Sequence, residues 1–317
     1  MPAREKSLID RIRRKTAGRG ATVVTGIGDD CAVLRVPTGH ELVITTDFTL
    51  ENVHFRREWH PPEVVGWRCL TRGLSDIAAM GGDPRAAFLS LALDRDVPQK
   101  WVDRFVAGLL GAAKEFRVPL AGGDTAESAG GIQADIVLVG SVPKGKAVLR
   151  SGAQEGDGIY VTGELGGSAA ALELLRKEKI RAADYERHFH PLARVAVGQW
   201  LRRRGLASAM IDLSDGLSTD LLHICEESRV GAVIEAGAIP RASVGRPRKH
   251  VRLDLALHGG EDYELLFTSA GKIPVKVAGV PARQIGQVTR ERGIVLIEDG
   301  RRRKFVARGW EHFTANL

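Results

Sequence analysis

The stretch AMIDLSDGLSTDLLHICEES, residues 209–228, indicates the kind of fold this chain adopts. Residues 209–213 are mostly apolar over the length of a buried strand, and residues 215–228 carry leucine, isoleucine and cysteine at helical spacing. Asp212 stands near the end of the strand, and Asp215 opens the helix, where its carboxylate is a good capping group. A strand that runs directly into an amphipathic helix is typical of an α/β fold.

The same alternation of strands and helices continues on both sides of this stretch. The further strands that we predict lie at 31–36, 41–46, 84–93, 132–142, 158–162, 230–235, 263–268 and 294–298. The further helices lie at 61–81, 98–116, 167–176 and 191–204. The segment 143–158 is polar and rich in glycine, so it predicts a linker. We therefore predict an α/β (α+β) chain of two domains, residues 1–146 and 147–317.

Length and composition exclude several classes of protein. The chain has 317 residues, 44% hydrophobic and 27% charged, which is typical of a soluble globular protein of about two domains. Its longest apolar runs fall far short of the roughly 20 residues of a membrane helix, and residues 1–15 lack the apolar core of a signal peptide. Cys31, Cys69 and Cys225 form no CxxC pair and lie in apolar-periodic segments, so we expect reduced, structural thiols and a cytoplasmic location.

The formal net charge of +7 raises the question of a nucleic-acid partner. The basic residues cluster in short runs within 202–204, 241–252 and 301–304. Such runs are usually solvated faces, and no helix-turn-helix, zinc-finger or RNP pattern accompanies them. We expect neither a nucleic-acid nor a membrane partner.

Five short segments place an aspartate after an apolar strand or helix, next to glycine, serine or threonine: 28–30, 45–47, 75–76, 123–125 and 212–215. Two carboxylates about 5 Å apart repel by roughly 3 kcal/mol at an effective dielectric near 20. If these acids meet in one cleft, hard cations would neutralise them, and magnesium holding substrate phosphates is the natural choice. The alternative is that each aspartate only caps a helix or stabilises a turn.

The sequence carries none of the common ATP-binding signatures. It has no GxxxxGK[ST] loop, no GxGxxG after a strand, and no HRD or DFG pair. A protein that handles ATP with this sequence uses another scaffold.

Eight motifs in this order resemble those of the thiamine-monophosphate kinases. They are GIGDDCAVL (26–34), TTDFTLENVHF (45–55), LSDIAAMGGDP (74–84), GGDT (122–125), RSGAQEGD (150–157), IDLSDGL (211–217), GGEDYELLF (259–267) and GWEHF (309–313). This family belongs to the superfamily of ATP-using enzymes that includes aminoimidazole ribonucleotide synthetase. The resemblance covers nearly the whole chain. It implies a homodimer with an N-terminal sheet-plus-helix dimerisation domain and a C-terminal α/β domain.

The resemblance also implies an activity and a set of site residues. The activity is transfer of the ATP γ-phosphoryl group to thiamine monophosphate, with several magnesium ions. The residues that it implies as magnesium ligands are Asp30, Thr45, Thr46, Asp47, Asp76, Asp124, Asp212 and Asp215. Those implied as ATP contacts are Gly123, Asp124, Arg150 and Ser214, and those implied as thiamine-phosphate contacts are His54, Glu261 and Trp310. No dedicated general base is expected, because the attacking phosphate oxygen is already ionised.

The sequence departs from the family pattern at a few positions. Asn52 stands where a glycine is usual, Gly73 replaces a common asparagine, and the pair at 154–155 replaces a basic residue and a proline. Two other functions stay open. One is another ATP-dependent member of the same superfamily that acts through a phosphorylated intermediate. The other is a non-catalytic phosphate or nucleic-acid binder, which the many aspartates disfavour.

Trp310 provides a test of the implied substrate. A cation over an indole face gains about 0.5–2 kcal/mol, and thiamine carries a cationic thiazolium ring. Trp310→Ala should therefore raise the KM for thiamine monophosphate by roughly 2- to 30-fold and leave the KM for ATP unchanged. Steady-state kinetics with each substrate varied in turn measure both. An equal effect on both substrates, or a loss of thermal stability alone, would mean that Trp310 is a core anchor.

Overall fold

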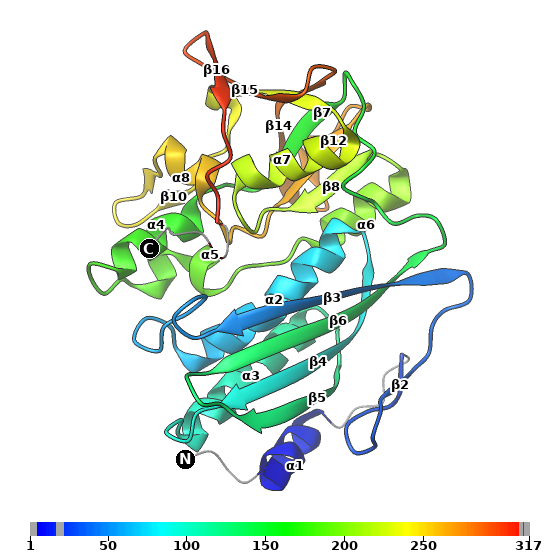
Figure 1. Cartoon of the computed structure of the whole chain (residues 1–317), viewed down its shortest axis with the longest axis vertical. Coiled ribbons are helices and arrows are strands. Elements are labelled where there is room, and N and C mark those ends of the chain that lie inside the picture. The colour runs from blue at the N-terminus through cyan, green and yellow to red at the C-terminus, as the bar shows by residue number, and fades with distance from the viewer. Residues whose placement is uncertain (1–4, 17–21, 311–312, 314–317) are drawn as a thin grey trace. The chain divides into compact units, whose positions relative to one another are not determined.

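The computed structural model describes residues 5–16, 22–310 and 313, and it divides into two compact units (Figure 1). The N-terminal unit comprises Met1–Ile77 and Gly82–Gly145, and the C-terminal unit comprises Ala78–Gly81 and Lys146–Leu317. Within the described part of the chain, no helix has the length and apolar character needed to cross a membrane.

The N-terminal unit is built on a four-stranded sheet with the strand order β3-β6-β4-β5. The strands are β3 (His40–Leu50), β4 (Asp83–Leu93), β5 (Leu120–Glu127) and β6 (Gln133–Pro143). β6 pairs antiparallel with both β3 and β4, whereas β4 and β5 are parallel. β3 is therefore an edge strand, and its side chains point alternately to the two faces of the sheet.

Two helices, α2 (Pro62–Ala79) and α3 (Gln99–Glu115), lie on one face of this sheet (Figure 1). They approach each other closely because glycines stand at the contact. A Cβ atom on Gly66 would lie 2.0 Å from the Phe105 carbonyl oxygen, and one on Gly108 would lie 1.9 Å from that of Glu63. No larger residue fits at either position, so these glycines set the spacing of the helix layer.

The rest of the N-terminal unit is a helix and a small hairpin. The helix is α1 (Glu5–Thr16), and the two-stranded sheet pairs β1 (Val23–Thr25) with β2 (Val33–Leu34). The sequence predicted a strand at 31–36 but neither α1 nor β1.

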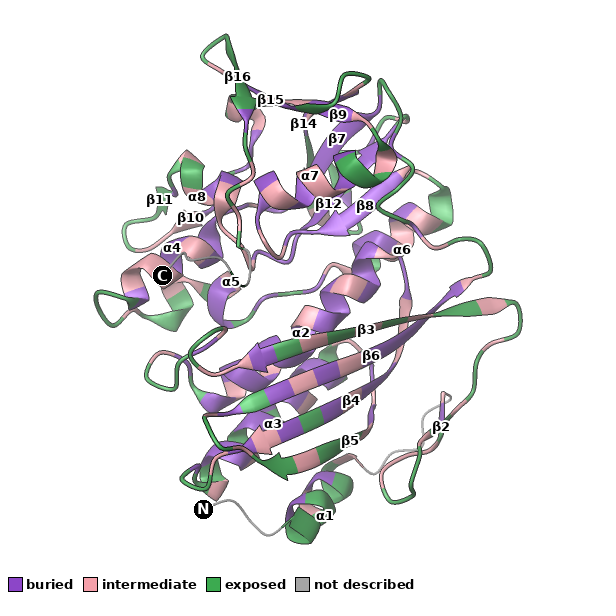
Figure 2. Cartoon of the chain, viewed as in Figure 1, coloured by how far each residue is buried: buried purple, intermediate pink, exposed green. Residues whose placement is uncertain are grey.

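The C-terminal unit is built on an eight-stranded, mainly antiparallel sheet. Its order is β16-β15-β9-β14-β7-β12-β8, with β13 paired to β14, and only β15 and β9 pair in parallel. The strands are β7 (Gly158–Thr162), β8 (Ala209–Asp212), β9 (Gly231–Glu235), β12 (Leu265–Ser269), β13 (Lys276–Val277), β14 (Val280–Thr289), β15 (Gly293–Glu298) and β16 (Arg301–Phe305). β7, β8 and β12 are buried along their whole length (Figure 2).

Both faces of this sheet carry a hydrophobic core. Ile159 and Leu266 belong to a cluster that also contains Leu221 of α7 (Leu217–Ser228). Tyr160 and Phe267, their neighbours in sequence, belong to a second cluster with residues of α6 (Val195–Arg204). Strands covered on both faces read as continuous apolar runs, which explains why the sequence predicted them well.

Short elements complete the C-terminal unit. They are α4 (Gly167–Leu175), η1 (Ala182–Asp184), α5 (Glu186–Phe189), η2 (Ala236–Ala238), β10 (Ser243–Val244), β11 (Lys249–His250) and α8 (Leu253–His258). β10 and β11 form a separate antiparallel pair.

The mixed α/β fold is confirmed, but near the acids one predicted strand ends too early and another strand was missed. The strand predicted at 41–46 runs on to Leu50, so Asp47 lies inside β3 and not after it. The GGDT motif lies inside β5, a strand that the sequence analysis did not predict. The end of β3 is partly polar and β5 contains two glycines, and both segments are partly exposed, which weakens the apolar signal of a strand.

Two of the three cysteines are buried, as expected for structural thiols. Cys69 and Cys225 lie in the cores of the two units, and burial raises the pKa of each thiol to about 12. Cys31 is exposed, so the expectation that it packs in an apolar segment is wrong. All three thiols are free.

Candidate active site

Three of the predicted ligands meet between β3 and α2 in the N-terminal unit. Thr45 and Asp47 are two residues apart on β3, so their side chains leave the same face of the sheet. The Thr45 hydroxyl donates to Asp76 Oδ2 on α2, and Arg72 Nε, one helical turn earlier, donates to Asp47 Oδ1 at 3.0 Å. Asp47 is thus already partly neutralised by a cation of the chain.

Asp30 and Asp124 lie elsewhere in the same unit, at a cavity of about 620 Å³. α1 contributes Ile9 and Ile12 to the wall, and β5 contributes Gly123. Both carboxylates are exposed, and Asp124 accepts a hydrogen bond from the Thr125 amide at 2.8 Å. An apolar cavity with acids at its wall has the composition of a small-molecule site.

Gly123 is required by the backbone of this cavity wall. Its φ is +147°, and a Cβ atom there would lie 1.8 Å from the Leu89 carbonyl oxygen. Only glycine permits this approach of β5 to β4. The sequence motif GGDT therefore has a local steric reason in addition to any ligand.

The two other predicted residues of this unit occupy different surroundings. Thr46 follows Thr45 on β3, so its side chain points to the opposite face and is exposed. His54 follows β3, and its Nδ1 accepts the Leu50 amide at 3.0 Å. In the neutral ring the proton is then on Nε2. Asn52 has a φ of 65°, which explains why a glycine is common there, and asparagine tolerates this conformation.

In the C-terminal unit, two further predicted residues converge on the turn formed by residues 213–216, which itself contains the predicted Ser214 and Asp215. The Glu261 amide donates to the Ser214 carbonyl at 2.8 Å, and the Trp310 amide donates to the Asp215 carbonyl at 3.0 Å. Residues about 50 and 100 positions away in sequence are therefore tied to one turn. Asp212 is the buried last residue of β8, immediately before this turn.

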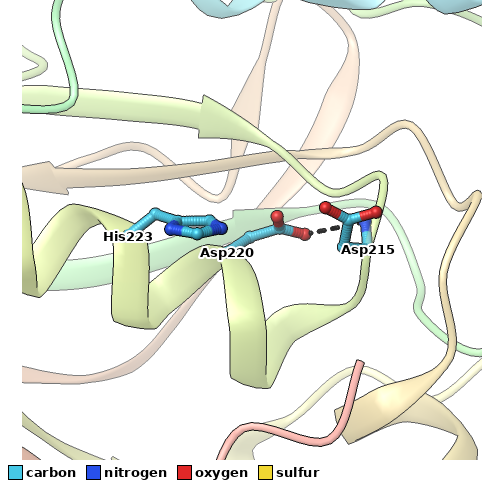
Figure 3. A group of neighbouring side chains, drawn as sticks. All are labelled: Asp215, Asp220 and His223. Carbon is cyan, nitrogen blue, oxygen red and sulfur yellow. Dashed lines mark hydrogen bonds between the residues drawn. The ribbon is translucent and has the colours of Figure 1, made fainter. Parts of the chain in front are cut away.

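Next to this turn, the structure places two candidate ligands that the sequence analysis missed, Asp220 and His223 of α7. Asp215, Asp220 and His223 bring one ligand atom each to within 4.8 Å of one another (Figure 3). Asp220 and His223 stand three apart in α7, and this spacing puts them on one helix face. Neither residue belongs to the five aspartate segments of the sequence, but their i, i+3 spacing on a predicted helix is the signal that could have found them.

Asp220 also explains why the predicted cap at Asp215 is wrong. α7 begins at Leu217, and Gly216, with a φ of 113°, occupies the cap position. Asp220 Oδ2 accepts the amides of Asp215 and Gly216 at 3.2 and 3.0 Å. Burial, and then the charges of Asp212 and Asp215, raise the pKa of Asp220 well above its ordinary value. A bound cation would relieve this accumulation of negative charge.

Arg150 lies away from the 213–216 turn. Its carbonyl accepts the hydroxyl of Ser228, at the far end of α7, and the preceding Leu149 carbonyl accepts the Met210 amide in β8. The four residues from Met210 to Ser214 span roughly 13 Å of extended chain. The backbone of Arg150 therefore lies near the opposite end of β8 from Ser214.

Trp310 is not a core residue. Its side chain is 48% exposed, although its backbone is held by Asp215. The role of core anchor, which the sequence left open, is thus disfavoured. Glu311 and His312 of the same motif lie outside the described residues.

Comparison with known proteins identifies relatives over the full length. Residues 28–142 match the AIR synthase related protein N-terminal domain, and residues 154–305 match the C-terminal domain. The thiamine-monophosphate kinase of Salmonella typhimurium is 39% identical, over 99% of both chains, and that of Bacillus subtilis is 34% identical, over 98% of this chain and 99% of the other.

Solved structures give the same result. The thiamine-monophosphate kinase from Stenotrophomonas maltophilia superposes with a TM-score of 0.81 at 36% identity, covering 95% of this chain and 98% of the other. A structure described as AaThiL complexed with AMPPCP and TMP has a TM-score of 0.77 at 33% identity, covering 98% and 97%.

The docking of residues 308–310 on the 213–216 turn can be tested at Gly309. A Cβ atom there would lie 2.2 Å from the Asp215 carbonyl oxygen and 2.4 Å from the Thr219 hydroxyl. Gly309→Ala should displace the segment, so that the Trp310 amide loses its protection in hydrogen exchange. Gly237→Ala is the matched control, because a Cβ atom there meets nothing within 4 Å. Equal protection of Trp310 in both variants would refute this docking.

Proposed function

This chain belongs to the thiamine-monophosphate kinase family, and from that premise we propose that it transfers the γ-phosphoryl group of ATP to thiamine monophosphate. The observation that carries the proposal is the convergence of Ser214, Asp215, Glu261 and Trp310 on one turn. Two of these are expected to contact the thiamine phosphate, and the other two are expected to contact ATP and metal. A relative of 33% identity is described as complexed with AMPPCP and TMP.

In the proposed reaction, a terminal phosphate oxygen of thiamine monophosphate attacks the γ-phosphorus. The bond from that phosphorus to the β–γ bridging oxygen breaks, and ADP leaves with the electron pair. Such transfers depend on in-line positioning and charge neutralisation, and the chain supplies positioning through the 213–216 turn. His54, with its proton on Nε2, carries an N–H donor of the kind that binds a phosphate oxygen.

The acids of both units fit magnesium. Asp47 and Asp76 offer carboxylate oxygens beside the Thr45 hydroxyl, a set that hard divalent cations prefer. Asp215 and the buried Asp220 form a second set. Asp212 lies close enough that its charge raises the pKa of Asp220. When bound, magnesium would neutralise the phosphate charge. The three free cysteines support a cytoplasmic location for this chemistry.

The direct assay combines the protein, ATP, magnesium and thiamine monophosphate and detects thiamine diphosphate. Asp47→Asn should abolish turnover because a ligand oxygen loses its charge. It should leave the fold intact, because relief of the repulsion between Asp47 and the nearby acids offsets the lost charge pair with Arg72. Asp96→Asn, at an exposed position, is the control. A near-normal rate for Asp47→Asn at limiting magnesium would contradict the ligand assignment.

We also propose that the protein is a homodimer formed through β3. This edge strand exposes Leu42, Ile44 and Phe48 on one face at 45, 62 and 57%. A long apolar edge strand is a ready site for pairing with a second copy.

The dimer is tested by measuring the mass in solution with light scattering. Ile44→Asp should convert a dimer to a monomer, because a charge would have to be buried in the interface. Val275→Asp is the control at another exposed apolar side chain, 83% accessible, in the other unit. A monomeric wild-type protein, or an Ile44→Asp variant that remains dimeric, would show that β3 is not the interface.

A further inference from the structure

Residues 259–263 form a segment with an unusual backbone. Glu261 has a φ of 64° and Tyr263 has a φ of 52°, while Asp262 between them is 8% exposed. Left-handed residues other than glycine are uncommon and persist only where their surroundings hold them. Two such residues within three positions indicate that this segment is held firmly.

Part of this hold comes from the 213–216 turn. Glu261 and Tyr263 donate their amides to the carbonyls of Ser214 and Leu213, at 2.8 and 2.9 Å. A Cβ atom on Gly260 would lie 2.4 Å from the Ser214 carbonyl oxygen, so the two backbones are in direct contact. These bonds fix the position of the segment along the turn.

The side chain of Asp262 provides the other part, from the opposite side. Its Oδ2 accepts the Gly166 amide at 2.6 Å, and its Oδ1 accepts the Ser168 amide at 3.4 Å, where α4 begins. Burial raises the pKa of Asp262 to about 7, and the two amides oppose that rise. The carboxylate therefore ties the middle of the segment to α4.

Glu264, two residues after Asp262, anchors the end of the segment independently. Glu264 is fully buried and accepts hydrogen bonds from Thr162 Oγ1 at 2.6 Å, from Arg194 Nε at 2.7 Å and from Arg187. The start of β12 is thus fixed without Asp262. Asp262, between the two left-handed residues, therefore adds a second restraint to that of the turn on the backbone conformation of Glu261.

We infer that Asp262 is a positioning residue for the phosphate acceptor: its bonds to α4 hold Glu261 in the left-handed conformation, which fixes the direction in which the Glu261 side chain leaves the backbone. This rests on the proposed function, in which Glu261 contacts thiamine monophosphate. Asp262 itself touches no substrate. Its effect reaches the reaction only through Glu261, so it should appear in the KM of one substrate.

The first variant is Asp262→Asn, which keeps the shape but leaves a single acceptor oxygen for the two amides of Gly166 and Ser168. It should raise the KM for thiamine monophosphate by roughly 10-fold, the cost of one lost charged hydrogen bond, with the KM for ATP unchanged. Asp157→Asn is the matched control: Asp157 is 3% exposed and accepts the Gln154 amide and the Ser208 hydroxyl, away from this segment. It should leave both KM values unchanged.

A double-mutant cycle separates positioning from general destabilisation. If Asp262 acts through Glu261, adding Asp262→Asn to Glu261→Gln should raise the KM for thiamine monophosphate little further. If Asp262→Asn does not fold, Ser168→Pro, in the first turn of α4, removes the amide that Asp262 accepts and should raise the same KM by a smaller factor. Ser168→Ala is its control, because both variants lose the hydroxyl that pairs with His188 Nδ1 at 2.9 Å but only the proline loses the amide.

Three results would overturn the inference: an unchanged KM in folded Asp262→Asn, an equal rise in the KM for ATP, or effects that add fully with Glu261→Gln. A wild-type protein that forms no thiamine diphosphate would instead refute the proposed function, so the two failures are distinguishable.

Discussion

The carbonyl groups of residues 213–215 accept three amides from distant parts of the chain, and the arrangement of the C-terminal unit around its site depends on these bonds. They come from Tyr263, Glu261 and Trp310 in that order along the turn. Buried carbonyls must be paired, so each bond is both a structural requirement and a fixed distance. These bonds hold the 213–216 turn, residues 261–263 and Trp310 together, so that side chains of the three segments can act together.

Carboxylates have two different tasks in this protein. Asp220 and Asp262 are buried, and each accepts two backbone amides, so each fixes the conformation of a segment. Asp30 and Asp124 are exposed at a cavity and remain accessible to ligands. The sequence places acids of both kinds next to glycine and serine, because tight turns and metal sites favour the same small residues. Asp220 combines both tasks, because it also lies beside Asp215 in the candidate magnesium set, and this proximity is a property of the fold.

Several strands were predictable because they are covered on both sides. β7, β8 and β12 are continuous apolar runs that local patterns identify. β5 was missed because its glycines serve close backbone contact with β4 and its outer face is open. The end of β3 was misjudged because Asp47 is polar inside a strand, where Arg72 from α2 pairs with it. In both cases a partner from another element compensates for what the local sequence lacks.

The sequence by itself determined the α/β class, the order of most elements and the acids from which a site is built, because apolar period and glycine-flanked aspartates are local properties of the chain. Only the tertiary structure decided that Asp220 and not Asp215 holds the start of α7, that Arg150 lies at the other end of β8, and that Asp262 clamps the Glu261 segment. These facts are hydrogen bonds, and apart from that of Asp220 they join residues dozens of positions apart. Their geometry arises when strands and helices pack, and no local pattern of residue types encodes it.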